Sequence, residues 1–378
     1  MIYNMVGYNA FEIDPSNWLD IQSFVRTGKA PNLFPVGYEI TMPHDTMGTI
    51  TWVVRAHNHH KAADESLAHT MTLETKEVIC NGDGSVDKMR YGERQAFYYA
   101  EEGLEPGTYN FGWTASDAHG SLTSSFYQFT ITKPIPAGGQ LSFVEIDTNT
   151  PVTSLLLNSF ESVESATILE SNISIAMGDG GTYLGSTSRE NINTSYRFIY
   201  GSNNYGQSAL RQWLNSENAA GSVWTPQTKF DRPPSWMDES DGFMHGLSPD
   251  FLKAVQPALI DCHTNSSFEI NSLDGTAFTK NKVYTLQDKF FLLSKPEVYG
   301  AYENTNYKDG TQLEYYKGLS NTERIKYALA GNATNSLLRT SSMATPHNVR
   351  KINYNNGSWT GSVYAMAQAG FTVACVIA

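Results

Sequence analysis

The sequence of 378 residues predicts an α+β protein in which antiparallel strands predominate and the helices are few and short. Aromatic residues are abundant, with 21 Tyr, 18 Phe and 7 Trp, and 30 Gly accompany many Ser, Thr and Asn residues. This composition is typical of β-rich proteins with long ordered connections. Several segments alternate apolar and polar residues, whereas only a few carry the 3.6-residue period of a helix.

The N-terminal part predicts one helix followed by strands. Asp14 is a suitable N-cap, Pro15 suits the first helical position, and Trp18, Ile21 and Val25 form an apolar stripe before Gly28 ends the helix. The segments "TITWVVRAH" (49–57) and "HTMTLETKEVI" (69–79) are expected to be strands, the second with alternating faces. The first region is therefore a helix and arm over residues 1–35.

A hairpin is expected next. "EPGTYNFGWTAS" (105–116) and "SSFYQFTIT" (124–132) alternate and are joined by a turn-forming "DAHGS". The Pro- and Gly-rich stretch 133–140 has the composition of a linker. It divides a β-rich, sandwich-like region over 36–135 from a C-terminal domain over 136–378.

The second half mixes short helices with strands. Residues 171–187 predict a strand pair around a glycine turn, and "KFFLLS" (289–294) predicts a buried strand. Ser208 and Ser248 are expected to cap helices, the second with Pro249 at its first position. "SNTERIKYALAG" (320–331) predicts a further helix, because Ser320 and Glu323 have the spacing of a capping box.

Charge and cysteine content exclude several classes of function. The net charge of −12 argues against general nucleic-acid binding. Cys80, Cys262 and Cys375 are too few for a disulfide framework, so each is expected to be a small buried apolar residue. Neither a signal peptide nor a membrane-spanning stretch is expected. After Glu323 the chain has no acidic residue but five basic ones, which marks the C-terminal segment as a distinct surface.

Five histidines lie between His44 and His69, and two of them, His57 and His59, would share one face of a strand. No Asp, Glu or Cys joins them at ligand spacing in the sequence. We therefore expect no metal and no cofactor, and we treat the histidines as parts of polar networks at strand ends. A metal-dependent enzyme or oxidase that uses the His44–His69 cluster, or Cys262, is kept as an alternative.

The C-terminal segment has the composition of a binding surface. Nearly every residue from Ser341 to Tyr364 is small, hydroxylated, amide or aromatic, the palette of antibody paratopes. "LLRT" (337–340) and "GFTVACVIA" (370–378) read as strands on either side of it. These two flanking strands predict that a loop of adaptable side chains, about residues 341–370, is fixed at both ends in a core.

Three runs give the chain a family resemblance: "YGSNNYGQSALRQWLNS", "DKFFLLSKPEVYG" and "SLLRTSS…NVRKINYNNGSW…YAMAQAGFTVACVIA". The chain resembles, from about Gly37 to Ala378, an uncharacterised family of gut Firmicutes and their phages with a C-type-lectin-like, formylglycine-generating-enzyme-like fold. Leu337, where the family pattern has Trp, and the ending "GFTVACV" depart from that pattern. Several such proteins are targets of diversity-generating retroelements, so the resemblance implies a hypervariable ligand face on a C-type-lectin-like C-terminal domain.

The resemblance and the composition together indicate which residues bind the ligand. The expected exposed binding residues are Ser342, Ala344, Thr345, His347, Asn348, Asn353, Tyr354, Trp359, Thr360, Ser362 and Tyr364. Trp359 would be an aromatic anchor. No catalytic residue is expected, because the related oxidases use a cysteine pair, whereas Cys375 is expected to lie in the terminal core strand.

The function expected from these features is that of a non-enzymatic phage virion protein, at a tail tip or the virion surface, that attaches to the host. Its partners would be a host cell-surface protein or glycan and other virion proteins. Analogy predicts a homo-oligomer, a trimer, without nucleic acid and without membrane insertion. The protein would be made in the bacterial cytoplasm and act outside it. A bacterial surface adhesin and a purely structural virion protein are the alternatives among non-enzymes.

Overall fold

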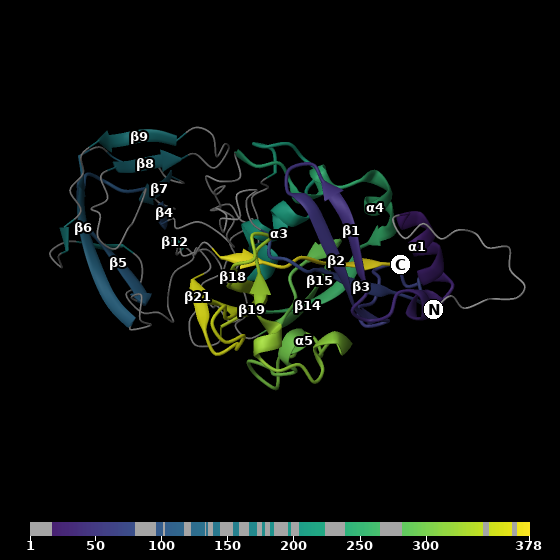
Figure 1. Ribbon diagram of the computed structural model, residues 1–378. Coiled ribbons are helices and arrows are strands. Elements are labelled where there is room, and N and C mark those ends of the chain that lie inside the picture. Colours follow the sequence, from purple (N-terminus) through teal and green to yellow (C-terminus); the bar gives the residue numbers. More distant parts are fainter. Residues whose placement is uncertain are drawn as a thin grey trace, which may run out of the picture.

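The fold was analysed in a computed structural model of the chain, which describes residues 17–79, 204–223, 239–264, 282–342, 348–364 and 369–378. Between residues 96 and 197 it describes the strands given below and a few residues beside them. Helices and antiparallel strands are mixed, so the protein is α+β as predicted (Figure 1). In the described part of the chain, no helix has the length and apolar character of a membrane span.

The central sheet places the last strand of the chain between strands from its beginning and middle. Its order is β1 (Glu39–His44), β2 (Gly48–His57), β3 (Met71–Thr75), β23 (Ala374–Ile377) and β13 (Val255–Gln256), and β16 (Phe290–Phe291) also pairs with β23. All of these pairings are antiparallel. Every residue of β3 is buried, so its burial does not alternate as predicted, because both faces of the sheet are covered here.

A second sheet carries the C-terminal segment. Its order is β21 (Ser362–Tyr364), β20 (Asn348–Ile352), β19 (Ser336–Ser341) and β22 (Gly370–Phe371). The β19–β22 pair is parallel and the other two pairs are antiparallel. Two short hairpins accompany it: β14 (Ala258–Thr264) with β15 (Lys282–Asp288), and β17 (Lys326–Tyr327) with β18 (Ala333–Thr334).

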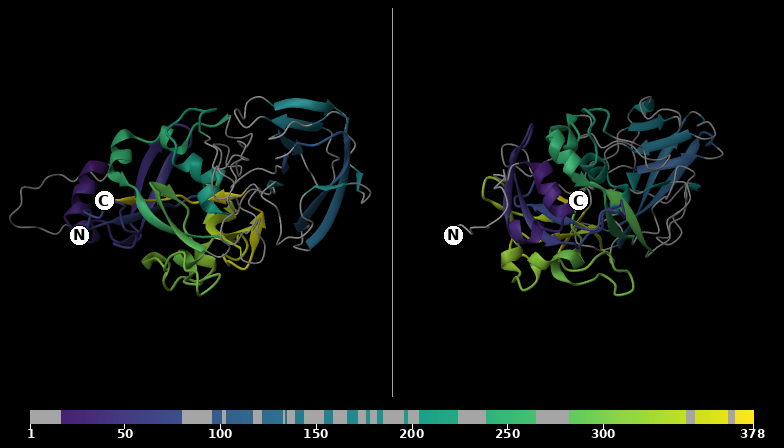
Figure 2. Two further views of the ribbon diagram at one scale, coloured as in Figure 1. Left: turned by 180° about the vertical axis from the view of Figure 1, so that it is seen from behind. Right: turned by 90° about the vertical axis from the view of Figure 1, so that its right-hand side faces the viewer.

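A separate group of strands lies at the end of the molecule away from helix α1 (Figures 1 and 2). One of its sheets has the order β12-β4-β7-β8-β9 and the other β10-β6-β5-β11. The predicted hairpin is confirmed, since β5 and β6 pair antiparallel along their whole length. The strands of this group are β4 (Ala96–Ala100), β5 (Gly107–Ser116), β6 (Leu122–Ile131), β7 (Gly139–Phe143), β8 (Ser154–Asn158), β9 (Ala166–Ser171), β10 (Ala176–Met177), β11 (Thr182–Leu184) and β12 (Tyr196–Arg197).

These sheets divide the chain differently from the predicted regions 36–135 and 136–378. Strands β1–β3 belong with the C-terminal strand β23, whereas β4 pairs with β7, across the expected linker. The predicted pairing within 171–187 is also wrong, because β10 pairs with β6 and β11 pairs with β5. Local composition carried no information about which strands pair across long sequence separations.

Short helices lie against the central sheet and the second sheet. They are α1 (Trp18–Arg26), α2 (Ala30–Leu33), α3 (Ala209–Leu214), α4 (Pro249–Ala254) and α5 (Lys295–Tyr299), with 3₁₀ turns at Tyr205–Gln207, Phe243–Gly246, Glu314–Tyr316 and Thr322–Arg324. Ser208 and Ser248 cap α3 and α4 as predicted. Helix α1 is capped by Asn17, whose side chain accepts from the backbone N–H groups of Leu19 and Asp20, so the predicted start at Asp14 is wrong. Asp14 and Pro15 themselves lie outside the described residues.

Aromatic side chains fill the space between these helices and the central sheet. The Phe251 ring lies 4.4 Å from that of Trp18 and 5.2 Å from that of Trp52, measured between centroids, and Phe290 joins them from β16. The chain terminus is fixed at the same place, since the Gln22 side-chain amide of α1 donates to the Ala378 carbonyl at 2.7 Å. The segment 370–378 is therefore deeply anchored, as its apolar sequence predicted.

Replacing Phe251 with Ala should lower the free energy of unfolding by about 3–5 kcal/mol, because it removes a fully buried ring from this cluster. Leu19→Ala, on the exposed side of α1, is the control and should change it by no more than about 0.5 kcal/mol. Denaturant unfolding followed by tryptophan fluorescence measures both. Equal losses from the two variants would contradict the assignment of the core.

Candidate functional site

Strand β19, called the floor strand below, lies beside the first strand of the predicted binding segment in the second sheet. All six of its residues, Ser336–Ser341, are buried, and it has β20 on one side and β22 on the other. Strand β20 is only partly covered, with Val349 and Ile352 buried and Asn348, Arg350 and Lys351 half-buried. The structure thus places adaptable side chains beside a strand that is closed to solvent.

The connection from β20 to β21 forms a compact turn that presents exposed side chains. The Gly357 N–H donates to the Asn353 carbonyl at 2.7 Å, and Gly357 has a φ of +65°, which favours glycine. The Asn353 side chain accepts from the backbone N–H of Asn355 at 2.9 Å. Tyr354 projects from this turn with 45% of its surface exposed. Because these bonds hold the backbone, the side chains at the tip are exposed without the loop being loose.

The predicted binding residues are distributed unevenly. Tyr354 and Thr360 are exposed, and Asn348, Asn353, Trp359 and Ser362 are partly exposed. Ser342 is only 1% exposed and its N–H donates to the Asn348 carbonyl, so its expected place on the exposed face is wrong. It continues β19, where the sheet covers it. Ala344, Thr345 and His347 lie outside the described residues, and Tyr364 is described only as part of the β21 backbone.

Trp359 lies on a cluster of charged side chains. The Lys295 ammonium is 3.3 Å from the centre of its ring, and the Arg350 guanidinium carbon is 5.8 Å from it. Both cations bind Glu303, Lys295 at 2.6 Å and Arg350 through two bonds of 2.7 Å each. The cation–π contact and the shared carboxylate fix the orientation of the indole. Glu303 and Lys295 have no separate signal in the sequence, which is why sequence reasoning did not assign them a role.

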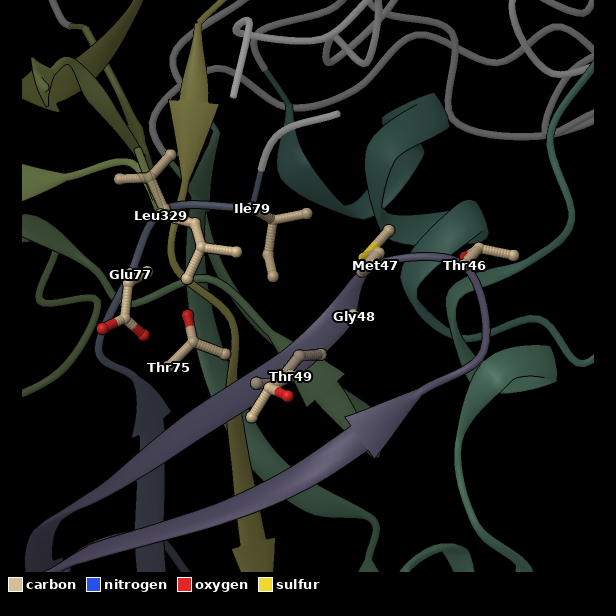
Figure 3. Close-up of a pocket in the computed structure, with 10 residues that line it drawn as sticks. Thr46, Met47, Gly48, Thr49, Thr75, Glu77, Ile79 and Leu329 are labelled. Atoms are coloured by element: carbon tan, nitrogen blue, oxygen red, sulfur yellow. The ribbon is translucent and has the colours of Figure 1, made fainter. Parts of the chain in front are cut away.

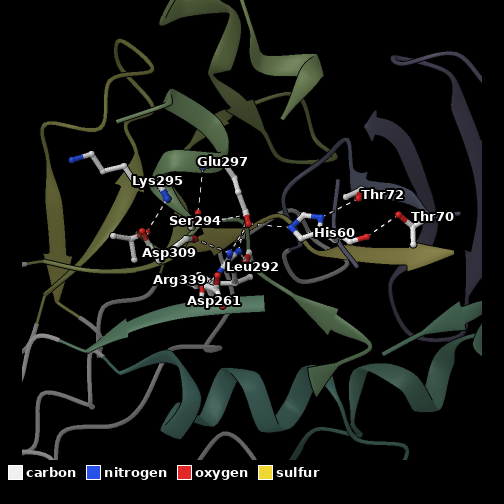
Figure 4. Close-up of polar contacts among 11 residues, drawn as sticks. His60, Thr70, Thr72, Asp261, Leu292, Ser294, Lys295, Glu297, Asp309 and Arg339 are labelled. Atoms are coloured by element: carbon white, nitrogen blue, oxygen red, sulfur yellow. Dashed lines mark hydrogen bonds and ion pairs between the residues drawn. The ribbon is translucent and has the colours of Figure 1, made fainter. Parts of the chain in front are cut away.

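Beneath this cluster, a buried ion pair joins helix α5 to strand β19 (Figure 4). The Arg339 guanidinium donates to both carboxylate oxygens of Glu297, and also to the carbonyls of Leu292, Asp261 and Asp309. Ser294 and Glu297 form the capping box of α5. Burial alone would raise the pKa of Glu297, but Arg339 and His60 outweigh it and hold the carboxyl ionised.

A second buried cluster surrounds Glu74 on β3. Its carboxylate accepts from Arg55 at 2.7 Å, Lys326 at 3.0 Å and the hydroxyls of Tyr316 and Thr372 at 2.5 Å each. Burial would raise the pKa of Glu74, but Lys326 and Arg55 bring it to about 2. Burial lowers the pKa of Lys326 to about 8 in spite of Glu74.

The Glu74 cluster explains why the predicted helix over residues 320–331 is absent. The Ser320–Glu323 bonds do form, with the Ser320 hydroxyl donating to Glu323 at 2.6 Å, but only the 3₁₀ turn Thr322–Arg324 follows. Lys326 is then drawn toward Glu74, and Tyr327 accepts a backbone bond from Val78. Tertiary contacts therefore override the local helix signal.

His59, His60 and Glu297 come within 4.8 Å of one another, the spacing of a metal site. The His60 ring bonds to Glu297 and to the Thr72 hydroxyl, at 3.0 Å each. Both Glu297 oxygens also bind Arg339, so a metal ion here would lie beside a guanidinium that already supplies the positive charge. The donor set does not fit a metal, and the contacts are those of a polar network. The sequence could not show this meeting, because Glu297 lies far from the histidines along the chain.

Neither described cysteine has the environment of a reactive thiol. Cys262 and Cys375 are buried, as expected, and burial raises the pKa of each thiol well above its usual range. Cys80 lies outside the described residues.

A groove of about 170 Å³ at the tip of the β1–β2 hairpin is lined mainly by apolar and hydroxyl groups, including Thr49, Ile79 and the exposed Leu329 (Figure 3). Its one titratable side chain is Glu77, so it offers no set of catalytic groups.

Residues 182–378, just over half of the chain, match a protein family described as "Domain of unknown function (DUF6273)". The chain belongs to this family. No curated protein and no solved structure matches the chain. The DUF6273 segment includes the face around Tyr354 and the ion pair beneath it. It leaves out β1–β3, although β3 is the neighbour of the terminal strand β23 in the central sheet. In this chain, the DUF6273 core is therefore completed by strands from the N-terminal region.

Glu297→Gln should lower the free energy of unfolding by about 3–5 kcal/mol, because it leaves the Arg339 guanidinium buried without its counter-charge. Glu39→Gln is the matched control. It removes an exposed pair with Lys76 and should cost at most about 1 kcal/mol. Denaturant unfolding compares the two, and a loss of under 1 kcal/mol for Glu297→Gln would contradict the role of the pair.

Asp309→Asn should stabilise the protein at pH 7.5 and have little effect at pH 4.5. Burial raises the pKa of Asp309 to about 6, so the folded state carries an unfavourable carboxylate above that pH, and stability is lost as the pH rises from about 4 to 6. Asn keeps an acceptor for the Thr340 hydroxyl. The expected gain at pH 7.5 is about 1–3 kcal/mol, measured by denaturant unfolding at both pH values. An equal change at the two pH values would contradict this account.

Proposed function

We propose that the chain is a binding protein whose recognition face consists of β20, β21 and the turn between them, residues 348–364. The contrast in burial carries this proposal: β19 is completely buried, whereas the adjacent turn exposes Tyr354, Asn355, Asn356 and Thr360. A fixed backbone with exposed, chemically adaptable side chains is the arrangement that binding surfaces require.

The chemistry of the recognition face suits a polar ligand on a cell surface. Tyr354 offers a flat, amphipathic ring, and Asn and Thr side chains offer both donors and acceptors of hydrogen bonds. Trp359 adds a larger ring whose orientation is fixed by Lys295 and Arg350. Within the described residues, no nucleophile with an adjacent base lies on this face, so its groups favour recognition over bond-breaking chemistry.

We place this activity in a phage virion, at a tail tip or surface, where the chain attaches to a host protein or glycan. The resemblance described under "Sequence analysis" supports this setting, together with a C-type-lectin-like C-terminal domain and a hypervariable recognition face. Assembly with other virion proteins and as a homo-oligomer, a trimer by analogy, would raise the avidity of a weak site. Display by a bacterial surface adhesin would use the same face.

Tyr354→Ala and Thr360→Ala should each weaken binding of the fluorescently labelled full chain to host cells by at least fivefold, since both remove exposed contacts. Two controls should bind like the wild type: Ser342→Ala, which changes a buried residue, and Thr41→Ala, an exposed threonine on β1. Flow cytometry over a panel of gut bacteria measures the binding. Loss of binding in the Thr41 variant alone, or no binding of the wild type to any strain, would contradict the proposal.

A further inference from the structure

Lys351 is held in a defined position on the recognition face. It lies in β20 opposite Leu337 of β19, and its aliphatic stem passes over Gly361. A Cβ atom at residue 361 would lie 3.1 Å from Cε of Lys351, 3.9 Å from its Nζ and 3.7 Å from Nδ2 of Asn353. The ammonium and the amide nitrogen therefore both lie beside Gly361, where the absence of a Cβ lets the Lys351 stem pack closely.

The charge of Lys351 is not balanced in the described part of the chain. Of the other basic residues after Glu323, Lys326 binds Glu74, Arg339 binds Glu297, Arg350 binds Glu303, and Arg324 donates to backbone carbonyls. For Lys351, no hydrogen bond or ion pair to a carboxylate is found among the described residues. Half-burial lowers its pKa, and no acidic neighbour in the described ranges raises it again.

This arrangement predicts what the site would accept. A half-buried ammonium without a counter-ion loses hydration and gains nothing in return. An oxyanion placed between the ammonium and the Asn353 amide would restore the lost interaction through charge-assisted bonds. A neutral sugar or an apolar side chain would leave the charge unbalanced.

We propose that Lys351 and Asn353, over Gly361, form an anion-binding subsite of the recognition face that takes a carboxylate or phosphate group of the ligand. As a feature of the natural ligand, this inference rests on the proposed function. The subsite is defined by its own geometry and can be tested with small anions alone. Acidic sugars and phosphate-bearing surface polymers are the two sources of such a group.

The test follows the lysine side-chain resonances of the ¹³C-labelled full chain by NMR, with sodium glucuronate, inorganic phosphate and neutral glucose as probes. The Lys351 signal, assigned by its loss in Lys351→Met, should move saturably with glucuronate or phosphate and not with glucose. The stronger of the two responses identifies the source. Gly361→Ala, whose Cβ would displace the Lys351 stem, should weaken the response at least fivefold. Lys253, which is exposed, is the internal control.

Two results would overturn the subsite. Lys351 and Lys253 could respond alike to both anions, which would show only non-specific attraction, or Gly361→Ala could leave the response unchanged. Circular dichroism confirms that each variant is folded. Cell binding separates the two proposals. If Tyr354→Ala weakens it while Lys351→Met does not, the subsite takes no part in recognising the natural ligand, and the recognition face stands. If the wild type binds anions at Lys351 but no cell, the proposed function fails and the subsite stands.

Discussion

The ion pair between Glu297 and Arg339 joins helix α5 to the strand beneath the recognition face, and much of the C-terminal architecture depends on it. Two charges in a dry interior are costly unless every oxygen and N–H group has a partner. Here Glu297 also completes the capping box of α5 and bonds to His60, while Arg339 donates to three backbone carbonyls. The pair thus links the helix, the floor strand and the N-terminal histidine segment in one network. A network so fully satisfied specifies a single arrangement of these elements.

This network lets one short stretch of chain contain both a buried scaffold and an exposed surface. Strand β19 is joined to helix α5 by the bonds from its Arg339 to Glu297, and β23 is held between β3 and β13. Between these anchors, the turn at Asn353–Gly357 is held by backbone hydrogen bonds and by the Asn353 and Asn356 side chains, whereas Tyr354 and Asn355 are exposed. Tyr354 and Asn355 can then differ in chemistry at little cost in folding. That is the physical condition for a surface whose specificity is set by side chains alone.

The sequence predicted local features well and long-range ones poorly. The caps Ser208 and Ser248, the β5–β6 hairpin and the buried C-terminal strand were predictable, because capping, alternation and apolar runs are local signals. The helix expected at residues 320–331 was not formed, since Lys326 is drawn to Glu74, about 250 residues away in sequence. The pairing of β3 with β23 and of β4 with β7 could not be predicted for the same reason. Ser342 was placed on the surface because the composition of its segment could be read from the sequence, whereas its strand neighbours could not. The exposure of Tyr354 and Thr360 was predicted from composition together with the family resemblance. The partners that orient Trp359 were missed, because Glu303 and Lys295 stand out only once the chain is folded.

Hydrogen–deuterium exchange of a variant altered only at the face tests the central claim most directly. Its four substitutions would be Tyr354, Asn355, Asn356 and Thr360, each to Ala. If strands β19 and β23 are independent of the recognition face, their backbone amides should exchange as slowly in this variant as in the wild type. The amides of the turn should exchange faster than those of the two strands in both proteins. Faster exchange in β19 or β23 of the variant would show that the face side chains help to hold the scaffold, and would contradict the account.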